Sequence, residues 1–377
     1  MTTGPVGVAI VGAGVISRQY LRNLTAFPDL QVLGIADLDT ARAQTAAAEY
    51  GVPVAGGLAT VLALPEVEIV VNLTVPAAHV PVATAALAAG KHVYGEKPLA
   101  LDPAEGETLL ADAARRGLRV GGAPDTFLGA GIQSAMRAIA SGAIGTPVAV
   151  TTAMLNFGPE RWHPSPEFLF QPGAGPLHDM GPYYLTALVA LLGPVSVVAA
   201  RARRGRAERV IGSGPKAGTR FPVGIPTHVA ALVDFATAEA SAASTFSFDS
   251  ALPRTQFEIT GTEGTLSLPD PNTFTGPLRI RGAADQEWRL LPVTGTDMGR
   301  GIGVLEMARA LRAGQPHRAS GALAQHVLDT MTAIEHSAAR NEFRTVTSRC
   351  PRPTALPEDW DPLAATLLRS SGAPASA

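Results

Sequence analysis

The chain has 377 residues, of which 46% are hydrophobic and 16% charged, with a formal net charge of −2 at pH 7. A single core stops growing at about 250–300 residues, so this length predicts two domains. The charge balance gives no electrostatic basis for nucleic-acid binding, and the single cysteine, Cys350, excludes an intrachain disulfide and a cysteine-based metal site. The first apolar run is broken by glycines, so we expect no signal peptide, no membrane span and a cytoplasmic protein.

The first third of the chain alternates strand and helix patterns, which indicates a parallel sheet with helices on both faces. Short apolar runs predict the strands, and alanine-rich or amphipathic segments predict the helices. The predicted strands are Val6–Val11, 31–36, one near residue 54, 68–73, 92–94 and 119–121, and the predicted helices are 16–27, Thr40–Tyr50, 79–89 and 103–116.

After residue 125 the strands become longer and follow one another without regular helices, which predicts a second domain with an antiparallel or mixed sheet. The predicted strands are 148–155, Val195–Arg203, 227–235, 240–248, 256–260, 265–268 and 278–281, and the predicted helices are 127–141, 303–312 and Gly321–Arg340. We therefore divide the chain into a dinucleotide-binding domain at 1–125, a second domain at 126–346 and a tail at 347–377, whose last residues, 370–377, we expect to be disordered.

A glycine-rich loop, Gly12-Ala13-Gly14-Val15-Ile16-Ser17, follows the first strand and opens the first helix. Glycine at the tight turn and at the close backbone approach, with N–H groups at the helix start, is typical of a pyrophosphate site. Ser17 departs from the third glycine of the pattern. Asp37 ends the second strand, where a carboxylate accepts bonds from the ribose hydroxyls of NAD and repels the 2′-phosphate of NADP. Because the residues that follow, Leu38 and Asp39, bring no cation, we predict NAD rather than NADP.

A second motif, Glu96-Lys97-Pro98, follows the strand that begins after Gly90 and Lys91. Pro98 holds Lys97 out of helical geometry, at the end of a sheet strand where such folds bind their ligands. Desolvation beside a nicotinamide would lower the pKa of the lysine ammonium toward neutrality and make it an acid or base. Glu96 can orient the lysine or hold the cofactor.

Three segments together resemble the glucose–fructose oxidoreductase/inositol dehydrogenase (Gfo/Idh/MocA) family. They are Thr74-Val75-Pro76-Ala77-Ala78-His79, Gly90-Lys91-His92-Val93 and Glu96-Lys97-Pro98. The resemblance implies an N-terminal Rossmann domain and a C-terminal α/β domain with a large open sheet, which here is expected to be mainly antiparallel. It also implies NAD(P)-dependent oxidation or reduction of sugars and cyclitols by dimers or tetramers that associate through that sheet. On this basis we assign Thr74, Pro76, His79, Glu96 and Lys97 to the cofactor.

Asp179 and Tyr183 are four residues apart, so they share one face of the helix predicted to run to about residue 192. The family pattern has histidine where this chain has Tyr183, and that histidine commonly accepts the proton of the substrate hydroxyl. Three alternatives stay open: Tyr183 is the acid/base beside Lys97, Lys97 acts alone while Tyr183 binds substrate, or catalysis has been lost. His178 is a further candidate for substrate binding or a structural hydrogen bond.

The loop Arg161-Trp162-His163-Pro164-Ser165-Pro166-Glu167-Phe168 precedes this helix. Aromatic faces with a polar rim suit a polyhydroxylated ligand, so we assign Trp162 and His163 to substrate binding. Asp125, after the last strand of the first domain, is a weaker substrate candidate, as is His228. We expect no metal site, because no cluster has ligand spacing.

These observations favour an NAD(H)-dependent oxidoreductase acting on a secondary alcohol of a sugar, glycoside or cyclitol. Lys97, helped by Tyr183 or Asp179, would manage the hydroxyl proton. One alternative is a glycoside hydrolase or lyase that uses NAD transiently, which release of an aglycone without net NADH would support. Another is a non-catalytic dinucleotide sensor, favoured by the missing histidine and disfavoured by the intact Glu96-Lys97-Pro98.

Overall fold

The computed structural model describes residues 4–367, so the predicted disorder of 370–377 lies outside the described residues. The chain folds into two compact units. Among the described residues, the first unit holds 4–128, 296–324 and 359–367, and the second holds 129–295 and 325–358. These units differ from the predicted ranges because two late segments return to the first unit. Within residues 4–367, no helix combines the length and apolar character needed to cross a membrane.

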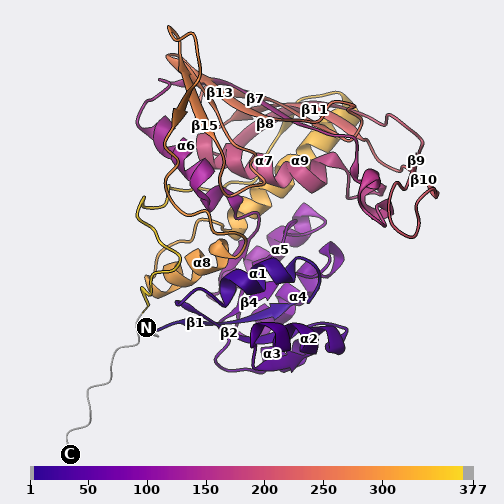
Figure 1. Cartoon of the computed structure of the whole chain (residues 1–377), viewed down its shortest axis with the longest axis vertical. Helices are drawn as coiled ribbons and strands as arrows, with labels where there is room; N and C mark the ends of the chain where they lie inside the picture. Colours follow the sequence, from indigo (N-terminus) through magenta and orange to yellow (C-terminus); the bar gives the residue numbers. More distant parts are fainter. Residues whose placement is uncertain (1–3, 368–377) are drawn as a thin grey trace, which may run out of the picture. The chain divides into compact units, whose positions relative to one another are not determined.

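The first unit is a six-stranded parallel sheet in the order β3-β2-β1-β4-β5-β6. Every residue of β1 and β4 is buried, because helices cover both faces of the sheet. Chain order reverses between β1 and β4, and ligands of such sheets bind where their strands end. The strands are β1 Val6–Val11, β2 Leu30–Ala36, β3 Val54–Gly56, β4 Ile69–Asn72, β5 His92–Gly95 and β6 Val120–Gly122 (Figure 1).

Caps set the limits of the helices in this unit. Asp39 accepts hydrogen bonds from the amides of Ala41 and Arg42 at the start of α2, and Gly51 ends that helix in a left-handed conformation. Pro76 is the first residue of α4, three residues before the predicted start, since proline is favoured at that position. The helices are α1 Ser17–Leu24, α2 Thr40–Tyr50, α3 Leu58–Leu62, α4 Pro76–Ala88, α5 Pro103–Arg115 and α8 Ile302–Arg312. The five-residue α3 was not predicted.

Two arginines of α8 hold the returning segment on the parallel sheet. Arg309 Nε donates to Asp29 Oδ2 over 2.8 Å, and Arg312 forms a two-pronged pair with Glu68. Asp29 also accepts the amide of Thr366 at 2.8 Å. The first unit is therefore closed by residues nearly three hundred positions from its core strands, which explains why a continuous boundary near residue 125 describes it incompletely.

The second unit is built on a nine-stranded mixed sheet in the order β16-β15-β14-β13-β7-β12-β11-β8-β17. Among the described strands of this sheet, β12 and β7 form the only parallel pair. Its strands are β7 Pro147–Leu155, β8 Val195–Arg203, β11 His228–Phe235, β12 Ser241–Ser247, β13 Arg254–Gly261, β14 Gly264–Ser267, β15 Leu278–Gly282, β16 Arg289–Leu291 and β17 Arg344–Thr345, with a separate pair, β9 Glu208–Val210 and β10 Arg220–Pro222.

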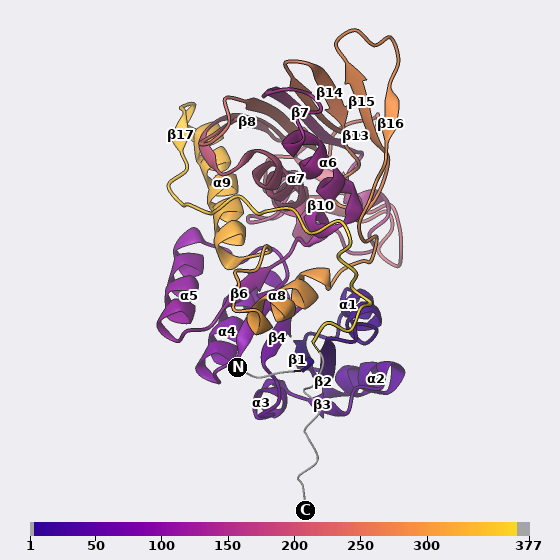
Figure 2. The same ribbon diagram turned by 90° about the vertical axis from the view of Figure 1, so that its left-hand side faces the viewer.

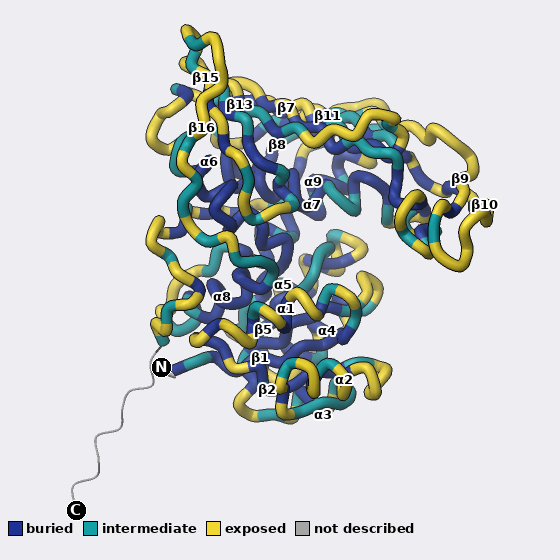
Figure 3. The backbone as a smooth tube through the Cα atoms, in the orientation of Figure 1, coloured by how far each residue is buried: buried dark blue, intermediate teal, exposed yellow. Residues whose placement is uncertain are grey.

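Helices cover one face of this sheet. α6 Ala130–Ala140, α7 Pro176–Leu192 and α9 Gly321–Arg340 lie on the same side in both views (Figures 1 and 2). α7 is buried along nearly its whole length (Figure 3). The predicted helix at 127–141 starts later, because Thr126–Leu128 forms a separate 3₁₀ turn. In the central strand β11 the odd-numbered residues, such as Val229 and Val233, are buried, whereas Leu232 points to the other face and is exposed.

Candidate functional site

A pocket of about 570 Å³ opens in the first unit, where β1, β2 and β4 end. Doubly wound sheets bind nucleotides at the point where the order of their strands reverses. Six of the residues predicted for the cofactor line it: Gly12, Gly14, Val15, Ile16, Asp37 and Thr74.

The two glycines of the loop have different reasons to be glycine. Gly12 has φ +103°, and a Cβ there would lie 2.6 Å from the carbonyl oxygen of Leu73, so the fold itself requires glycine. Gly14 has no positive φ, and a Cβ there would meet no protein atom within 4 Å. The open space above Gly14 therefore fits a ligand that approaches the backbone closely, as a pyrophosphate does.

Asp37 is held by the loop that it faces. Its Oδ2 accepts the amide of Ala13 at 2.7 Å, and its Oδ1 accepts the amide of Asp39 at 2.9 Å. The carboxylate is thereby fixed at the rim of the pocket with further lone pairs for ribose hydroxyls. Arg42, one turn into α2, also lines the pocket and lies 4.0 Å from Asp39. This cation is not among the residues directly after Asp37 in the sequence, because a helical turn brings Arg42 back to the strand end.

Large apolar side chains are exposed around the same pocket. Val15 is 90% exposed, Leu38 is fully exposed and Val75 is 67% exposed, and all three line the pocket. Exposed apolar residues that converge on one concavity are typical of a ligand site. Bases and a nicotinamide ring would cover these three side chains, so the residues present fit a dinucleotide.

A buried histidine connects the β4 loop to the lysine turn. His79 places Nδ1 2.6 Å from the carbonyl oxygen of Pro98 and Nε2 3.0 Å from that of Thr74. Asn72 donates to the carbonyl of His79 and accepts from the amide and hydroxyl of Thr74. His79 was predicted to bind the cofactor; both of its ring nitrogens face main-chain carbonyls, so it reaches the pocket through Thr74.

Lys97 lies in the turn after β5 and is partly exposed. Glu96 accepts two hydrogen bonds beside it, one from the main-chain amide of Lys97 at 3.0 Å and one from the hydroxyl of Tyr20 at 2.8 Å. Tyr20 is fully buried in α1. Glu96 therefore orients the lysine turn. Pro76, the first residue of α4, is exposed.

Asp125 is a structural residue of the first unit in this fold. It is fully buried, and its Oδ2 accepts the amides of Gly301 at 2.8 Å and Gly303 at 3.1 Å, which fixes the start of α8. Burial raises the pKa of the Asp125 carboxyl, while the charge of Arg300 and the two amides oppose that rise. The predicted role in substrate binding does not agree with a side chain enclosed in this way, because no solvent-facing surface of Asp125 remains.

The second unit carries the other predicted catalytic pair on the first turns of α7. Asp179 is partly exposed and Tyr183 is buried, four residues apart on one helix face. His178 Nε2 lies 2.8 Å from Glu335 Oε1 of α9, without the alignment of a hydrogen bond. His178 is thus directed to α9.

The predicted substrate loop forms an aromatic cluster on the second unit. His163 contacts Trp162 edge-to-face, with centroids 5.6 Å apart, and Phe168 in the same way at 5.5 Å. Trp162 is 68% exposed and Phe168 is 59% exposed. The 3₁₀ turns Pro159–Arg161 and Glu167–Phe170 bring these rings together. Their exposed faces can stack on a sugar ring.

Comparison with known proteins agrees with this geometry. Residues 6–122 match the GFO_IDH_MocA model, described as "Oxidoreductase family, NAD-binding Rossmann fold", and residues 132–267 match the "GFO/IDH/MocA C-terminal domain". The two matches together span more than half of the chain. The chain belongs to the GFO/IDH/MocA family. It is accordingly an NAD-binding oxidoreductase.

Characterised members of the family resemble the chain at moderate identity. The dTDP-3,4-didehydro-2,6-dideoxy-alpha-D-glucose 3-reductase of Streptomyces antibioticus is 31% identical over 209 residues, which are 54% of this chain and 62% of that protein. The trans-1,2-dihydrobenzene-1,2-diol dehydrogenase of Bos taurus is 26% identical over 308 residues, 80% of this chain and 86% of that protein. An NAD binding oxidoreductase from Klebsiella pneumoniae has a TM-score of 0.79 and 25% identity, covering 92% of this chain and all of that one.

Three residues that support the family motifs were not predicted from the sequence. Tyr20, Asn72 and Arg42 belong to this group. Asn72 lies two residues before Thr74, Arg42 reaches the pocket from the first turn of α2, and Tyr20 on α1 is 76 positions from Glu96. The i to i+3 spacing of Arg42 from Asp39 offered a local signal, whereas the contact of Tyr20 with Glu96 has none. Among the described residues there is no group of three His, Cys, Asp or Glu side chains that could hold a metal ion.

Proposed function

We propose that this oxidoreductase transfers a hydride between NAD(H) and a secondary alcohol of a sugar, glycoside or cyclitol. The observation that carries the proposal is the connection of the cofactor pocket to Lys97. Thr74 lines the pocket, and the buried ring of His79 joins its carbonyl to that of Pro98, the residue after Lys97. This link supports an amine beside the bound dinucleotide, as acid/base chemistry on a hydroxyl requires.

When bound, the nicotinamide supplies the hydride acceptor or donor, and the chain supplies the proton path. In the oxidative direction the substrate hydroxyl must lose a proton while its carbon loses a hydride. We assign the proton to the side chain of Tyr183, acting as its phenolate, or to the neutral amine of Lys97, with the Asp179 carboxylate orienting the hydroxyl. In the reductive direction the same groups return the proton. The i to i+4 spacing of Asp179 and Tyr183 gives two hydrogen-bonding groups to one helix face.

The substrate class follows from shape and polarity. The Trp162, His163 and Phe168 rings offer exposed apolar faces, which suit the C–H face of a cyclic polyol, while polar groups on α7 suit its hydroxyls. The relatives named above are a reductase of a nucleotide-linked sugar and a dehydrogenase of a cyclic diol. The first name describes reduction at a ring carbon of a sugar and the second describes oxidation of a ring diol, so both support redox chemistry between hydroxyl and carbonyl on a ring. The exposed aromatic loop favours a sugar, glycoside or cyclitol over a linear alcohol.

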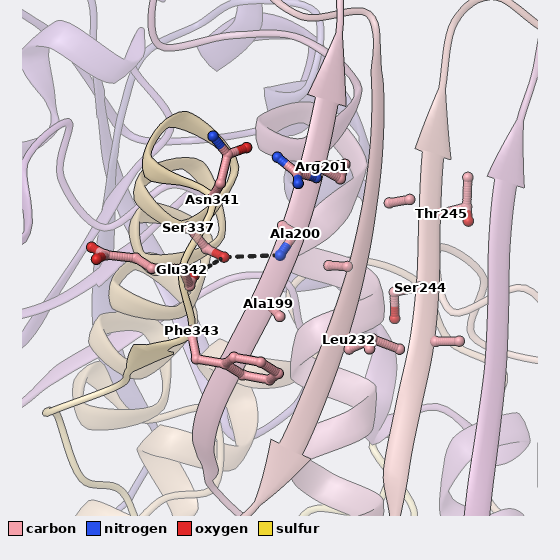
Figure 4. A pocket seen from close by; sticks show the side chains of 13 residues that line it. Ala199, Ala200, Arg201, Leu232, Ser244, Thr245, Ser337, Asn341, Glu342 and Phe343 are labelled. Atoms are coloured by element: carbon pink, nitrogen blue, oxygen red, sulfur yellow. Dashed lines mark hydrogen bonds between the residues drawn. The ribbon is translucent and has the colours of Figure 1, made fainter.

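We also propose that the protein is a homodimer or homotetramer joined through the uncovered face of the nine-stranded sheet. Leu232, at 53% exposure, stands between Ala199 and Ala243 of the neighbouring strands. Phe343 lies beside these side chains, and the hollow that they line together has a volume of about 360 Å³ (Figure 4). An apolar sheet face without a helical cover is commonly an interface.

The composition and the one buried cysteine suit a reducing, cytoplasmic setting.

The function is tested by turnover. Monosaccharides, glycosides and inositols are offered with NAD and with NADP, and the absorbance of the reduced nicotinamide is followed. We expect NADH formation with at least one cyclic polyol, and loss of that activity in Lys97→Ala. Formation of an aglycone without net NADH would instead indicate transient oxidation. Tight NAD binding with no turnover of any compound in either direction would contradict the proposal.

A further inference from the structure

The peptide that carries Lys97 is held on both sides. On the carboxyl side, His79 contacts the carbonyl of Pro98 at 2.6 Å. On the amino side, Glu96 Oε2 accepts the amide of Lys97 at 3.0 Å. The other oxygen of this carboxylate, Oε1, accepts the hydroxyl of Tyr20 at 2.8 Å. The direction in which the Lys97 side chain leaves the backbone therefore depends on a carboxylate that a distant tyrosine holds.

Tyr20 comes from the helix that follows the nucleotide loop. It is the fourth residue of α1, Ser17–Leu24, and it is fully buried. Burial, followed by the charge of Glu96, raises the pKa of the Tyr20 phenol well above its usual value. The phenol consequently stays protonated and acts as a donor across the working pH range. Tyr20 is not among the residues that line the nucleotide pocket.

We propose that Tyr20 is a positioning residue for Lys97 and acts through Glu96. This inference rests on the proposed acid/base role of Lys97. The hydroxyl of Tyr20 fixes the Glu96 carboxylate, the carboxylate fixes the Lys97 amide, and the amide fixes the orientation of the lysine turn. The same helix α1 begins at the pyrophosphate loop, so one rigid element sets both the cofactor site and the lysine turn.

The principal variant is Tyr20→Phe, which removes one hydroxyl and keeps the buried ring. Misplacement of a catalytic group by about 1 Å costs up to roughly 10²-fold in rate, so we expect kcat to fall by about 10-fold. The dissociation constant for NADH, measured by titration, should stay within about 2-fold, because the hydroxyl does not line the nucleotide pocket. Tyr50→Phe, at the partly exposed end of α2, is the matched control and should leave kcat unchanged.

A double-mutant cycle separates this role from a merely structural one. If Tyr20 acts through Glu96, the loss of kcat in Tyr20→Phe should disappear when Glu96 is already Ala, because the acceptor that connects Tyr20 to the lysine turn is then gone. Additive losses in the double variant would overturn the proposed route. A kcat for Tyr20→Phe equal to that of Tyr50→Phe would overturn the positioning role itself.

A measurement that does not require turnover keeps this test independent of the proposed function. The chain has three lysines, Lys91, Lys97 and Lys216, so reductive ¹³C-methylation gives few lysine signals, and Lys97→Arg identifies the one that belongs to Lys97. Tyr20→Phe should move the Lys97 signal and leave those of Lys91 and Lys216 in place. An unmoved Lys97 signal overturns the proposal even in a preparation with no measurable activity, whereas a moved signal with no wild-type turnover overturns only the proposed function.

Discussion

The two units place their functional residues by different means. In the Rossmann unit, the predicted residues follow short buried strands, and main-chain hydrogen bonds fix them, as with Asp37 on the amide of Ala13. In the second unit, Asp179 and Tyr183 stand on the long helix α7, and the aromatic cluster of Trp162 stands on 3₁₀ turns. The first arrangement is set by local geometry, whereas the second depends on how a long helix packs.

This difference predicts that the cofactor loop tolerates less variation than the aromatic loop. A Cβ at Gly12 would lie 2.6 Å from a carbonyl oxygen, so the cofactor loop has almost no freedom. The exposed faces of Trp162 and Phe168 meet no such restriction. The nucleotide half is therefore suited to one ligand, while the exposed loop of the other half is suited to differences in substrate among members of the family.

Lys97→Ala should have the largest effect. Removal of the amine eliminates a proton carrier, and acid/base groups contribute about 10²–10⁴-fold, so we expect kcat to fall toward 10⁴-fold. Binding of NADH, followed by titration calorimetry, should be largely retained. Lys216→Ala is the control, because Lys216 is exposed and paired only with Glu167 in the second unit. If Lys97→Ala keeps most of its kcat, the lysine is structural and the mechanism is wrong.

Tyr183→Phe tests whether the phenol of Tyr183, in the second unit, takes part in catalysis or in substrate binding. If the phenol transfers the substrate proton, kcat should fall by roughly 10²–10³-fold. If the phenol only binds the substrate, KM should rise while kcat stays nearly constant. Steady-state kinetics with the best substrate from the screen separates the two cases. Unchanged kcat and KM would remove Tyr183 from both roles and make His163 the next residue to replace.

The fold was predicted from the sequence more completely in the Rossmann unit than in the second. Alternating patterns gave the parallel sheet and the helix Thr40–Tyr50 with its limits, because a buried parallel strand reads as a short apolar run. The return of α8 to the first unit was not predictable, since it depends on contacts such as Asp125 with Gly301. Short elements, such as β16 and β17, carry too few residues to show a period.

The candidate site shows the same limit. Motif residues that touch a ligand, such as Gly14 and Asp37, follow from spacing along the chain. Residues that hold a motif residue in place, such as Tyr20 for Glu96, lie many positions away from it in the sequence. They stand among ordinary hydrophobic residues. Asp125 was assigned to substrate because it follows a sheet strand, a signal that does not distinguish a site residue from a helix-capping one.

Arg209→Met should have the largest effect on stability. Arg209 is buried in the second unit, where it pairs with Glu160 and Asp249 and ties the β9–β10 pair to the main sheet. Its loss leaves the buried carboxylate of Glu160 without its arginine partner, so the free energy of unfolding should fall by about 3–5 kcal/mol. Arg220→Met, which removes an exposed pair with Glu208, should cost at most about 1 kcal/mol. Urea denaturation measures both, and equal losses would contradict the burial argument.

Asp37→Ser should change cofactor selectivity by a smaller factor. Bonds to a charged group contribute about 1.5–3 kcal/mol, so the preference for NADH over NADPH should fall by roughly 10- to 100-fold. Arg42 lines the same pocket and becomes available to a 2′-phosphate once the nearby carboxylate is gone. The double variant Asp37→Ser/Arg42→Ala should lose the gain in NADPH binding. Calorimetric titration checks both, and equal binding of the two cofactors by the wild type would refute the role of Asp37.

Leu232→Asp should have the smallest effect on the subunit and a clear one on assembly. Leu232 points to the uncovered side of the sheet, so the subunit should lose no more than about 0.5 kcal/mol of stability. In an oligomer joined by that face, the charge would be buried against another copy, which is costly without a partner. Light scattering at micromolar concentration should therefore show the wild type as a dimer or tetramer and the variant as a monomer. Leu101→Asp, an equally exposed leucine of the first unit, should leave the wild-type mass unchanged. A monomeric wild type would show that the uncovered face of the sheet is not an interface between copies.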